Sequence, residues 1–104
     1  MDVVVLAQCE KELKKFPQDV LGMVADAVAK LKKNQTLSMP LSRSLPSVGK
    51  GVHELRIKDK GGQYRVVYVL KVKDAIYLVH AFKKKTQATS KKNIDLATRR
   101  IKSL

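Results

Sequence analysis

Two arginines on neighbouring predicted strands are the first candidates for chemistry. Arg56 lies in the run GVHELRIKDK, Arg65 lies in QYRVVYVLKV, and Lys60–Gly62 between them is typical of a tight turn. If the strands pair across this turn, the two guanidinium groups lie close together, which is costly unless an anion separates them. A guanidinium fork matches two phosphate oxygens, so the pair predicts a phosphate site. The alternative is that Arg56 simply pairs with Glu54 or with a helix carboxylate at the surface.

A run of lysines follows the last predicted strand, in the segment HAFKKKTQATSKKN. Lys83, Lys84 and Lys85 leave the end of this strand. Lys91 and Lys92 fall in the first turn of the helix that follows, where the helix dipole favours acids over bases. Lysines at an unfavourable helix end indicate a function other than stability, such as binding an anion. A solvated surface is the competing interpretation.

Glu54 and His80 are the candidates for proton transfer, with Tyr68 and Tyr77 behind them. A histidine on a central strand is more often a core residue with satisfied hydrogen bonds, and the same caution applies to His53. The sequence has no Gly-rich phosphate loop, no ligand-spaced pair of Cys or His, and no G-x-S-x-G motif. Nucleotide-cofactor, metal and serine-hydrolase chemistry lose their usual sequence support, so we expect neither a cofactor nor a metal.

The charge of the chain is strongly positive and unevenly distributed. Its 104 residues include 22 Lys and Arg against 9 Asp and Glu, a net charge of +13, and most of the excess lies after residue 49. Such a field attracts polyanions, nucleic acid first, with acidic protein and anionic membrane behind it. A basic surface that serves only solubility is the alternative.

The N-terminus and the cysteine content favour a cytoplasmic protein. The apolar run in MDVVVLAQCE is too short for a membrane span and has no basic flank for a signal peptide. The lone Cys9 has no partner for an internal disulfide, which favours a reducing compartment. We expect Cys9 to be a small core residue. We therefore expect no membrane partner.

Hydrophobic spacing predicts one α+β domain over residues 1–104, with an N-terminal helical hairpin packed on an antiparallel β-sheet and a C-terminal helix. The expected elements are a short strand at 3–6, a helical hairpin over 8–33 with a second helix that opens at Pro17, a long loop over 34–51 that could contain a short strand, three strands at 52–58, 63–72 and 75–82, and a helix that begins near Thr89 or Ser90. The short connections require antiparallel neighbours.

The order of these segments resembles a known family of toxins. The motifs LSMP, HELR, YRVVY and VHAFKKKT, followed by a terminal helix with A-x-R, recur in that order between Leu37 and Ile101. The helical hairpin from CEKELKKFPQDV onward is similar as well. The chain resembles the HigB-type, phage-derived branch of the RelE/ParE toxin superfamily. This implies a RelE-like fold and a type II toxin that cleaves mRNA in the ribosomal A site.

The resemblance also implies positions for the functional residues. The family's bases on the strand matching ELRI, in YRV-x-Y and after the last strand correspond to Arg56, Arg65 and Lys84, with Lys83 beside the last of these. Glu54 stands where RelE has a further strand base. The tyrosine of the family's YELR motif is a histidine here, and the tyrosine of its final helix region is a serine.

The chemistry of RNA cleavage assigns a role to each candidate. Cleavage without a metal needs the 2′-hydroxyl deprotonated, the non-bridging oxygens neutralised and the leaving 5′-oxygen protonated. Arg56 and Arg65 suit the non-bridging oxygens, while Lys84 suits the phosphate or the leaving group. Glu54 or His80 is the candidate to remove the 2′ proton.

The remaining bases and the partners follow from the same hypothesis. We assign Lys58, Lys83, Lys85, Lys91 and Lys92 to RNA and ribosome binding. Expected partners are the ribosome, mRNA and an acidic cognate antitoxin, which by resemblance is a HigA-like helix-turn-helix protein. Three alternatives stay open: a ParE-like toxin that inhibits DNA gyrase, a basic nucleic-acid-binding module without catalysis, and a regulatory subunit that has lost activity.

Overall fold

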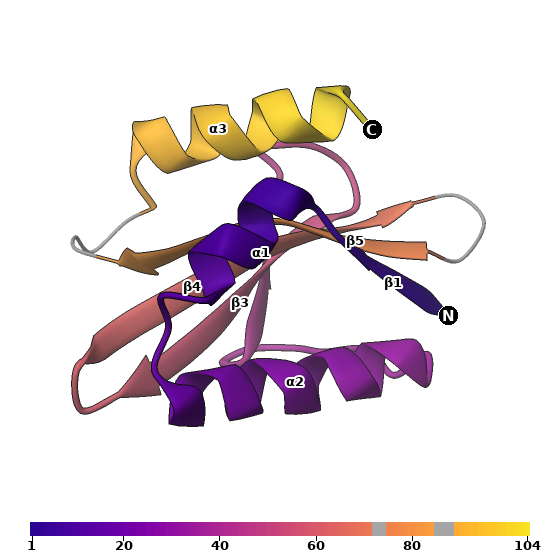
Figure 1. Cartoon of the computed structure of the whole chain (residues 1–104). Coiled ribbons are helices and arrows are strands. Elements are labelled where there is room, and N and C mark those ends of the chain that lie inside the picture. Colours follow the sequence, from indigo (N-terminus) through magenta and orange to yellow (C-terminus); the bar gives the residue numbers. More distant parts are fainter. Residues whose placement is uncertain (72–74, 85–88) are drawn as a thin grey trace.

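The computed structural model describes residues 1–71, 75–84 and 89–104, and in these ranges the chain forms five strands and three helices (Figure 1). In chain order they are β1 (Asp2–Val5), α1 (Ala7–Leu13), α2 (Gln18–Lys32), β2 (Ser42–Ser44), β3 (Val52–Asp59), β4 (Gly62–Lys71), β5 (Ala75–Lys84) and α3 (Lys91–Lys102). The predicted α+β architecture is confirmed. No helix in the described ranges is long and apolar enough to cross a membrane.

The strands form one sheet in the order β1-β5-β4-β3-β2. The neighbours from β2 to β5 are antiparallel, as the short connections predict, whereas β1 runs parallel to β5. The sheet is therefore mixed, because the long segment between β1 and β5 provides the crossover that a parallel pair needs. The long predicted loop does contain a short strand, β2, which forms an edge of the sheet.

The helices cover both faces of the sheet, with α2 and α3 on opposite sides (Figure 1). One core cluster packs α1 and α2 against the sheet and includes Cys9, Val20, Leu55, Val66 and Ile76, each fully buried. The pKa of the Cys9 thiol is raised to about 12, mainly by burial and also by nearby Glu12, while Arg100 lowers it. The thiol is therefore an unreactive core group.

A second, smaller core cluster packs α3 against the other face. Ala97 of α3 is fully buried against Val52, Val67, Val69 and Val79. The helix begins as predicted, since the Ser90 side chain accepts a hydrogen bond from the backbone N–H of Asn93 at 3.3 Å. This cap fixes where α3 starts above the sheet.

Candidate functional site

The β3–β4 hairpin brings the two predicted arginines together. Arg56 and Arg65 are direct cross-strand partners, so the predicted pairing is confirmed. The turn between the strands is closed by Asp59, whose Oδ1 accepts hydrogen bonds from the N–H groups of Gly61 and Gly62 at 2.8 and 3.0 Å. Side chains alternate along a strand, so the two arginines point away from the α1 and α2 core and towards the α3 face.

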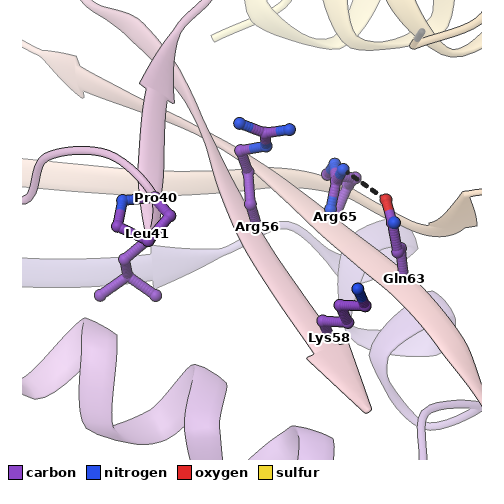
Figure 2. Close-up of a pocket in the computed structure, with 6 residues that line it drawn as sticks. All are labelled: Pro40, Leu41, Arg56, Lys58, Gln63 and Arg65. Atoms are coloured by element: carbon purple, nitrogen blue, oxygen red, sulfur yellow. Dashed lines mark hydrogen bonds between the residues drawn. The ribbon is translucent and has the colours of Figure 1, made fainter. Parts of the chain in front are cut away.

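A surface pocket of about 420 Å³ lies beside the arginine pair (Figure 2). It is lined by Pro40, Leu41, Arg56, Lys58, Gln63 and Arg65. Three of these described lining residues are cations, and two come from adjacent positions on neighbouring strands. The pocket is therefore suited to an anion that several donors can reach at once.

Arg65 forms the buried part of this site, with 3 % of its surface exposed. Its Nη2 donates to Oε1 of Gln63 at 2.9 Å, the dashed line in Figure 2, and its Nη1 donates to the Tyr64 carbonyl at 3.4 Å. Its Nε lies 3.4 Å from Oε1 of Glu54. Within the described residues this Nε has no hydrogen-bond partner, so its contact with the carboxylate is electrostatic.

Competing influences act on the Arg65 charge. Burial lowers the pKa of Arg65, Glu54 raises it, and Arg56 and Arg43 lower it, leaving the pKa below its ordinary value. An arginine stays protonated at neutral pH even so. The lowered pKa means that the site disfavours its own positive charge, which an incoming anion would relieve.

Glu54 lies beneath the arginines and not at the pocket surface. It is 2 % exposed, and its Oε2 accepts a hydrogen bond from Oγ1 of Thr89 at 2.7 Å. Its other oxygen faces Arg65. A carboxylate so enclosed cannot touch a substrate in this conformation, so the geometry suits a group that orients Arg65.

A further cation, Arg43, joins the site from β2. It is the direct cross-strand partner of Glu54 and therefore lies on the arginine face, where it is exposed. The sequence prediction missed it because 34–51 was interpreted as a loop. The available signal was that Arg43 is the only charged residue between positions 34 and 49.

The two lysines that end β5 lie on opposite faces of the sheet. Lys84 pairs with Gln63 and shares the arginine face, whereas Lys83 pairs with Tyr64 and shares the opposite face. The Lys83 Nζ lies over the Tyr64 ring, 5.7 Å from its centre. Of these two lysines, the structure brings Lys84 to the arginines and leaves Lys83 away from them.

Lys84 has an altered proton affinity. Burial lowers the pKa of Lys84, and the nearby positive charges of Arg65, Arg56 and Arg43 lower it further. Glu54 raises it, but the pKa stays below its ordinary value. A lysine with a lowered pKa gives up its proton more readily, which suits a proton donor to a leaving oxygen. Lys84 is thus the described group beside the arginines that best fits proton transfer.

His80 belongs to a different cluster from the arginines. At a β-bulge in β5, Val67 pairs with His80 but Tyr68 pairs with Leu78, so Val79 is the extra residue. His80 is 3 % exposed and stacks on Phe82, the cross-strand partner of Arg65, with ring centres 5.0 Å apart. The structure does not bring His80 into the arginine pocket.

Both ring nitrogens of His80 are engaged inside the protein. Nδ1 lies 3.0 Å from each carboxylate oxygen of Glu12, and Nε2 lies 2.7 Å from Oδ1 of Asn93. Glu12 also accepts two hydrogen bonds from Arg100, at 2.8 and 3.2 Å, and one from the backbone of Ala81 at 3.1 Å. This geometry fits the alternative of a satisfied core histidine, and no sequence signal pointed to Glu12.

The Glu12 carboxylate is held in its charged form. Burial raises its pKa, but hydrogen bonds from Arg100, the Ala81 backbone and His80 lower it more, so that the pKa lies below its ordinary value. The cluster links α1, β5 and α3 around one charged group. These contacts hold α3 against the sheet.

The other predicted RNA-binding lysines that the structure describes are all exposed. Lys58 lines the pocket, and Lys91 and Lys92 lie on the first turn of α3. The Lys91 Nζ is 3.0 Å from Oδ2 of Asp95, an exposed pair that contributes little to stability. Lys85 lies outside the described residues.

The arrangement as a whole suits a phosphodiester. Arg43, Arg56, Arg65 and Lys84 share one face, with a buried carboxylate to orient one arginine. Such donors can neutralise the oxygens of a phosphorus centre as charge develops on them. In residues 1–71, 75–84 and 89–104, no three His, Cys, Asp or Glu side chains gather as metal ligands would.

Comparison with known proteins places the chain among phage-derived proteins with a toxin-like fold. The model of the family described as phage-derived protein Gp49-like matches residues 11–102. The crystal structure of isolated E. coli RelE toxin, in its P21 form, superposes with a TM-score of 0.58 at 15 % identity, covering 94 % of this chain and 96 % of that one.

A second RelE structure, of an E. coli variant with two arginines replaced by alanine in the free state, gives a TM-score of 0.59 at 18 % identity, with 96 % of each chain covered. No curated protein matches the chain significantly. At these identities the structures establish a shared fold, and the predicted RelE-like fold is confirmed.

Proposed function

The chain belongs to the Gp49-like family of phage-derived proteins, and on that basis we propose that it is the toxin of a type II toxin-antitoxin system and cleaves mRNA on the ribosome. Residues 1–104 act as one toxin domain in the cytoplasm. The observation that most supports this proposal is the cross-strand pair of Arg56 and Arg65 beside an open, cationic pocket. Two guanidinium groups held side by side favour a bound phosphate over an empty site.

The proposed reaction is an attack of the message's own 2′-oxygen on the adjacent phosphorus. The new bond joins the 2′-oxygen to phosphorus, and the bond from phosphorus to the 5′-oxygen breaks. The products are a 2′,3′-cyclic phosphate and a 5′-hydroxyl end. Arg56, which is half-buried, binds a non-bridging oxygen of the phosphate, and the buried Arg65 binds the same phosphate from the floor of the pocket. Both stabilise the charge that grows on the phosphorane.

Lys84 is the proposed donor of the proton to the leaving 5′-oxygen. Its lowered pKa and its place on the arginine face support this role. Glu54 and His80, predicted as bases, are at most 3 % exposed and engaged inside the protein. We therefore assign the 2′ proton to solvent water and to neither side chain, and attribute much of the rate to in-line orientation of the message by the ribosome.

The proposed partners follow from the charge distribution. Lys58 continues the cationic face, Lys91 and Lys92 extend it along α3, and Lys85 follows β5 in sequence. These lysines are proposed contacts to ribosomal RNA, whose phosphates attract such a surface. Lys83, on the other face, is left outside the cleavage centre. An acidic antitoxin, by resemblance HigA-like, would cover the basic half and prevent indiscriminate RNA binding.

The test is to map message 5′ ends by primer extension in a cell-free translation reaction. Arg56→Gln removes one phosphate ligand from a half-buried site, and Lys30→Gln removes the same charge from the exposed surface of α2, on the other face of the sheet. We expect translation-dependent cuts with wild type and Lys30→Gln, and at least tenfold fewer with Arg56→Gln. Intact message accompanied by gyrase-dependent DNA breaks would favour a ParE-like toxin instead.

A further inference from the structure

Thr89 connects the start of α3 with the floor of the arginine site. It precedes the N-cap Ser90, is half-buried, and its Oγ1 donates a hydrogen bond of 2.7 Å to Oε2 of Glu54. The other oxygen of that carboxylate faces Nε of Arg65 at 3.4 Å. Thr89, Glu54 and Arg65 therefore form a continuous chain from the helix to the pocket.

The hydrogen bond from Thr89 orients Glu54. A carboxylate with 2 % of its surface exposed has little access to water and needs donors from the protein. The contact with Arg65 lacks hydrogen-bond geometry in the described part of the chain, whereas the contact with Thr89 is short and charge-assisted. Among the described residues, the Thr89 hydroxyl thus gives the carboxylate its directional restraint.

Thr89 is itself held in place by the neighbouring cap. Ser90 Oγ accepts hydrogen bonds from the backbone N–H and from Nδ2 of Asn93, at 3.3 and 2.8 Å. Asn93 in turn binds His80 of β5, which binds Glu12 of α1. Ser90, the residue after Thr89, is therefore linked through Asn93 and His80 to β5 and α1. These links give Thr89 a defined position.

The orientation of Arg65 decides what it offers to a ligand. Its guanidinium has five N–H groups, and three of them face groups of the protein. The Nε–H faces Glu54, one N–H donates to Gln63, and one donates to the Tyr64 carbonyl. Counted over the contacts of the described residues, about two N–H groups remain for a bound phosphate. A rotation of the guanidinium would change which of them face the pocket.

We propose that Thr89 is a positioning residue for phosphodiester cleavage: its hydroxyl orients Glu54, and Glu54 holds Arg65 with its free N–H groups towards the pocket. This inference rests on the proposed function, because it takes Arg65 as a ligand of the scissile phosphate. Thr89 touches no substrate itself.

The test compares Thr89→Val, which keeps the shape and removes the hydroxyl, with Thr89→Ser, which keeps the hydroxyl. Thr98→Val is the matched control, since Thr98 lies on α3 and donates to the Ile94 carbonyl at 2.8 Å, away from Glu54. We expect message cleavage to fall about tenfold in Thr89→Val, as for loss of a hydrogen bond to a charged group. Thr89→Ser should recover to within about threefold and Thr98→Val to within about twofold of wild type.

An NMR measurement of the Arg65 Nε–H resonance tests the positioning without any activity. We expect this resonance to shift in Thr89→Val and to stay near its wild-type position in Thr89→Ser and Thr98→Val. Thr89→Ala repeats both measurements if the valine variant loses its fold. Unchanged cleavage by the folded variant, or an unshifted Arg65 resonance, would overturn the inference.

The two proposals fail in distinguishable ways. A wild-type protein that leaves every message intact refutes the nuclease, and the positioning of Arg65 as a catalytic ligand falls with it. A wild-type protein that cleaves, together with a Thr89→Val variant that cleaves equally well, refutes only the role of Thr89.

Discussion

Replacement of Arg65 by alanine is expected to destabilise the fold as well as to damage the site. The side chains of Arg65 and Glu54 are each 3 % exposed and 3.4 Å apart. Removal of one partner leaves the other charge buried without compensation, which costs about 3–5 kcal/mol. We expect about 3 kcal/mol, at the lower end of that range, because Arg43 remains opposite Glu54. For a domain of this size, this lowers the Tm by roughly 12–24 °C.

A second substitution separates this loss of stability from the loss of function. Glu54→Gln removes the uncompensated charge while its amide oxygen can still accept the hydrogen bond from Thr89. The double variant Arg65→Ala with Glu54→Gln should therefore be about 1–2 kcal/mol more stable than Arg65→Ala alone, yet equally inactive. Thermal unfolding of wild type, both single variants and the double variant, followed by circular dichroism, measures these differences.

Two results would refute this reasoning. One is a Tm for Arg65→Ala within a few degrees of wild type, which would mean that the buried pair carries little energy. The other is a double variant less stable than Arg65→Ala, which would mean that Glu54 is stabilising without its partner. Either result would require a different account of why an acid lies beneath the basic site.

Three further predictions concern the charged groups around the sheet. Glu12→Gln should lower the free energy of unfolding by about 2 kcal/mol at neutral pH. Although burial raises the pKa of Glu12, its hydrogen bonds lower it overall, so this stability is present above the pKa of an unfolded glutamate and is lost as the pH falls through the folded pKa. Urea unfolding at several pH values should show the variant and wild type converging in acid. Because burial and then the arginines lower the pKa of Lys84, Arg56→Gln should raise it, as an NMR titration of the Lys84 side chain would measure. Lys84→Ala should reduce message cleavage at least tenfold more than Lys83→Ala, because the two side chains lie on opposite faces of the sheet.

Features set by local sequence could be predicted. The alternation around Lys60–Gly62 predicted the hairpin that pairs Arg56 with Arg65, because a tight turn fixes the register of the strands that it joins. The cap at Ser90 likewise depends on a side chain three residues from its donor. Both signals lie within a few residues of the structure they determine.

Features set by distant contacts could not be predicted. Arg43 reaches the site through a strand of three residues, which is too short to show any periodicity. The bulge at Val79 changes which face of the sheet the following side chains occupy. A strand that is apolar on both faces has no alternation in its sequence that would reveal such a bulge. The contact of His80 with Glu12 joins residues 68 positions apart, so only the folded chain brings the two together.

The most direct test of the proposed chemistry is cleavage of a message that carries a single 2′-deoxynucleotide at a mapped cut position, on ribosomes stalled with that codon in the A site. The all-ribonucleotide message serves as the reference, and the 5′ ends of the products are identified. We predict that the wild-type protein cuts the reference to leave a 5′-hydroxyl end and leaves the deoxy-substituted position intact. Cleavage at the deoxy-substituted position, or a 5′-phosphate end, would contradict attack by the 2′-oxygen at the arginine site.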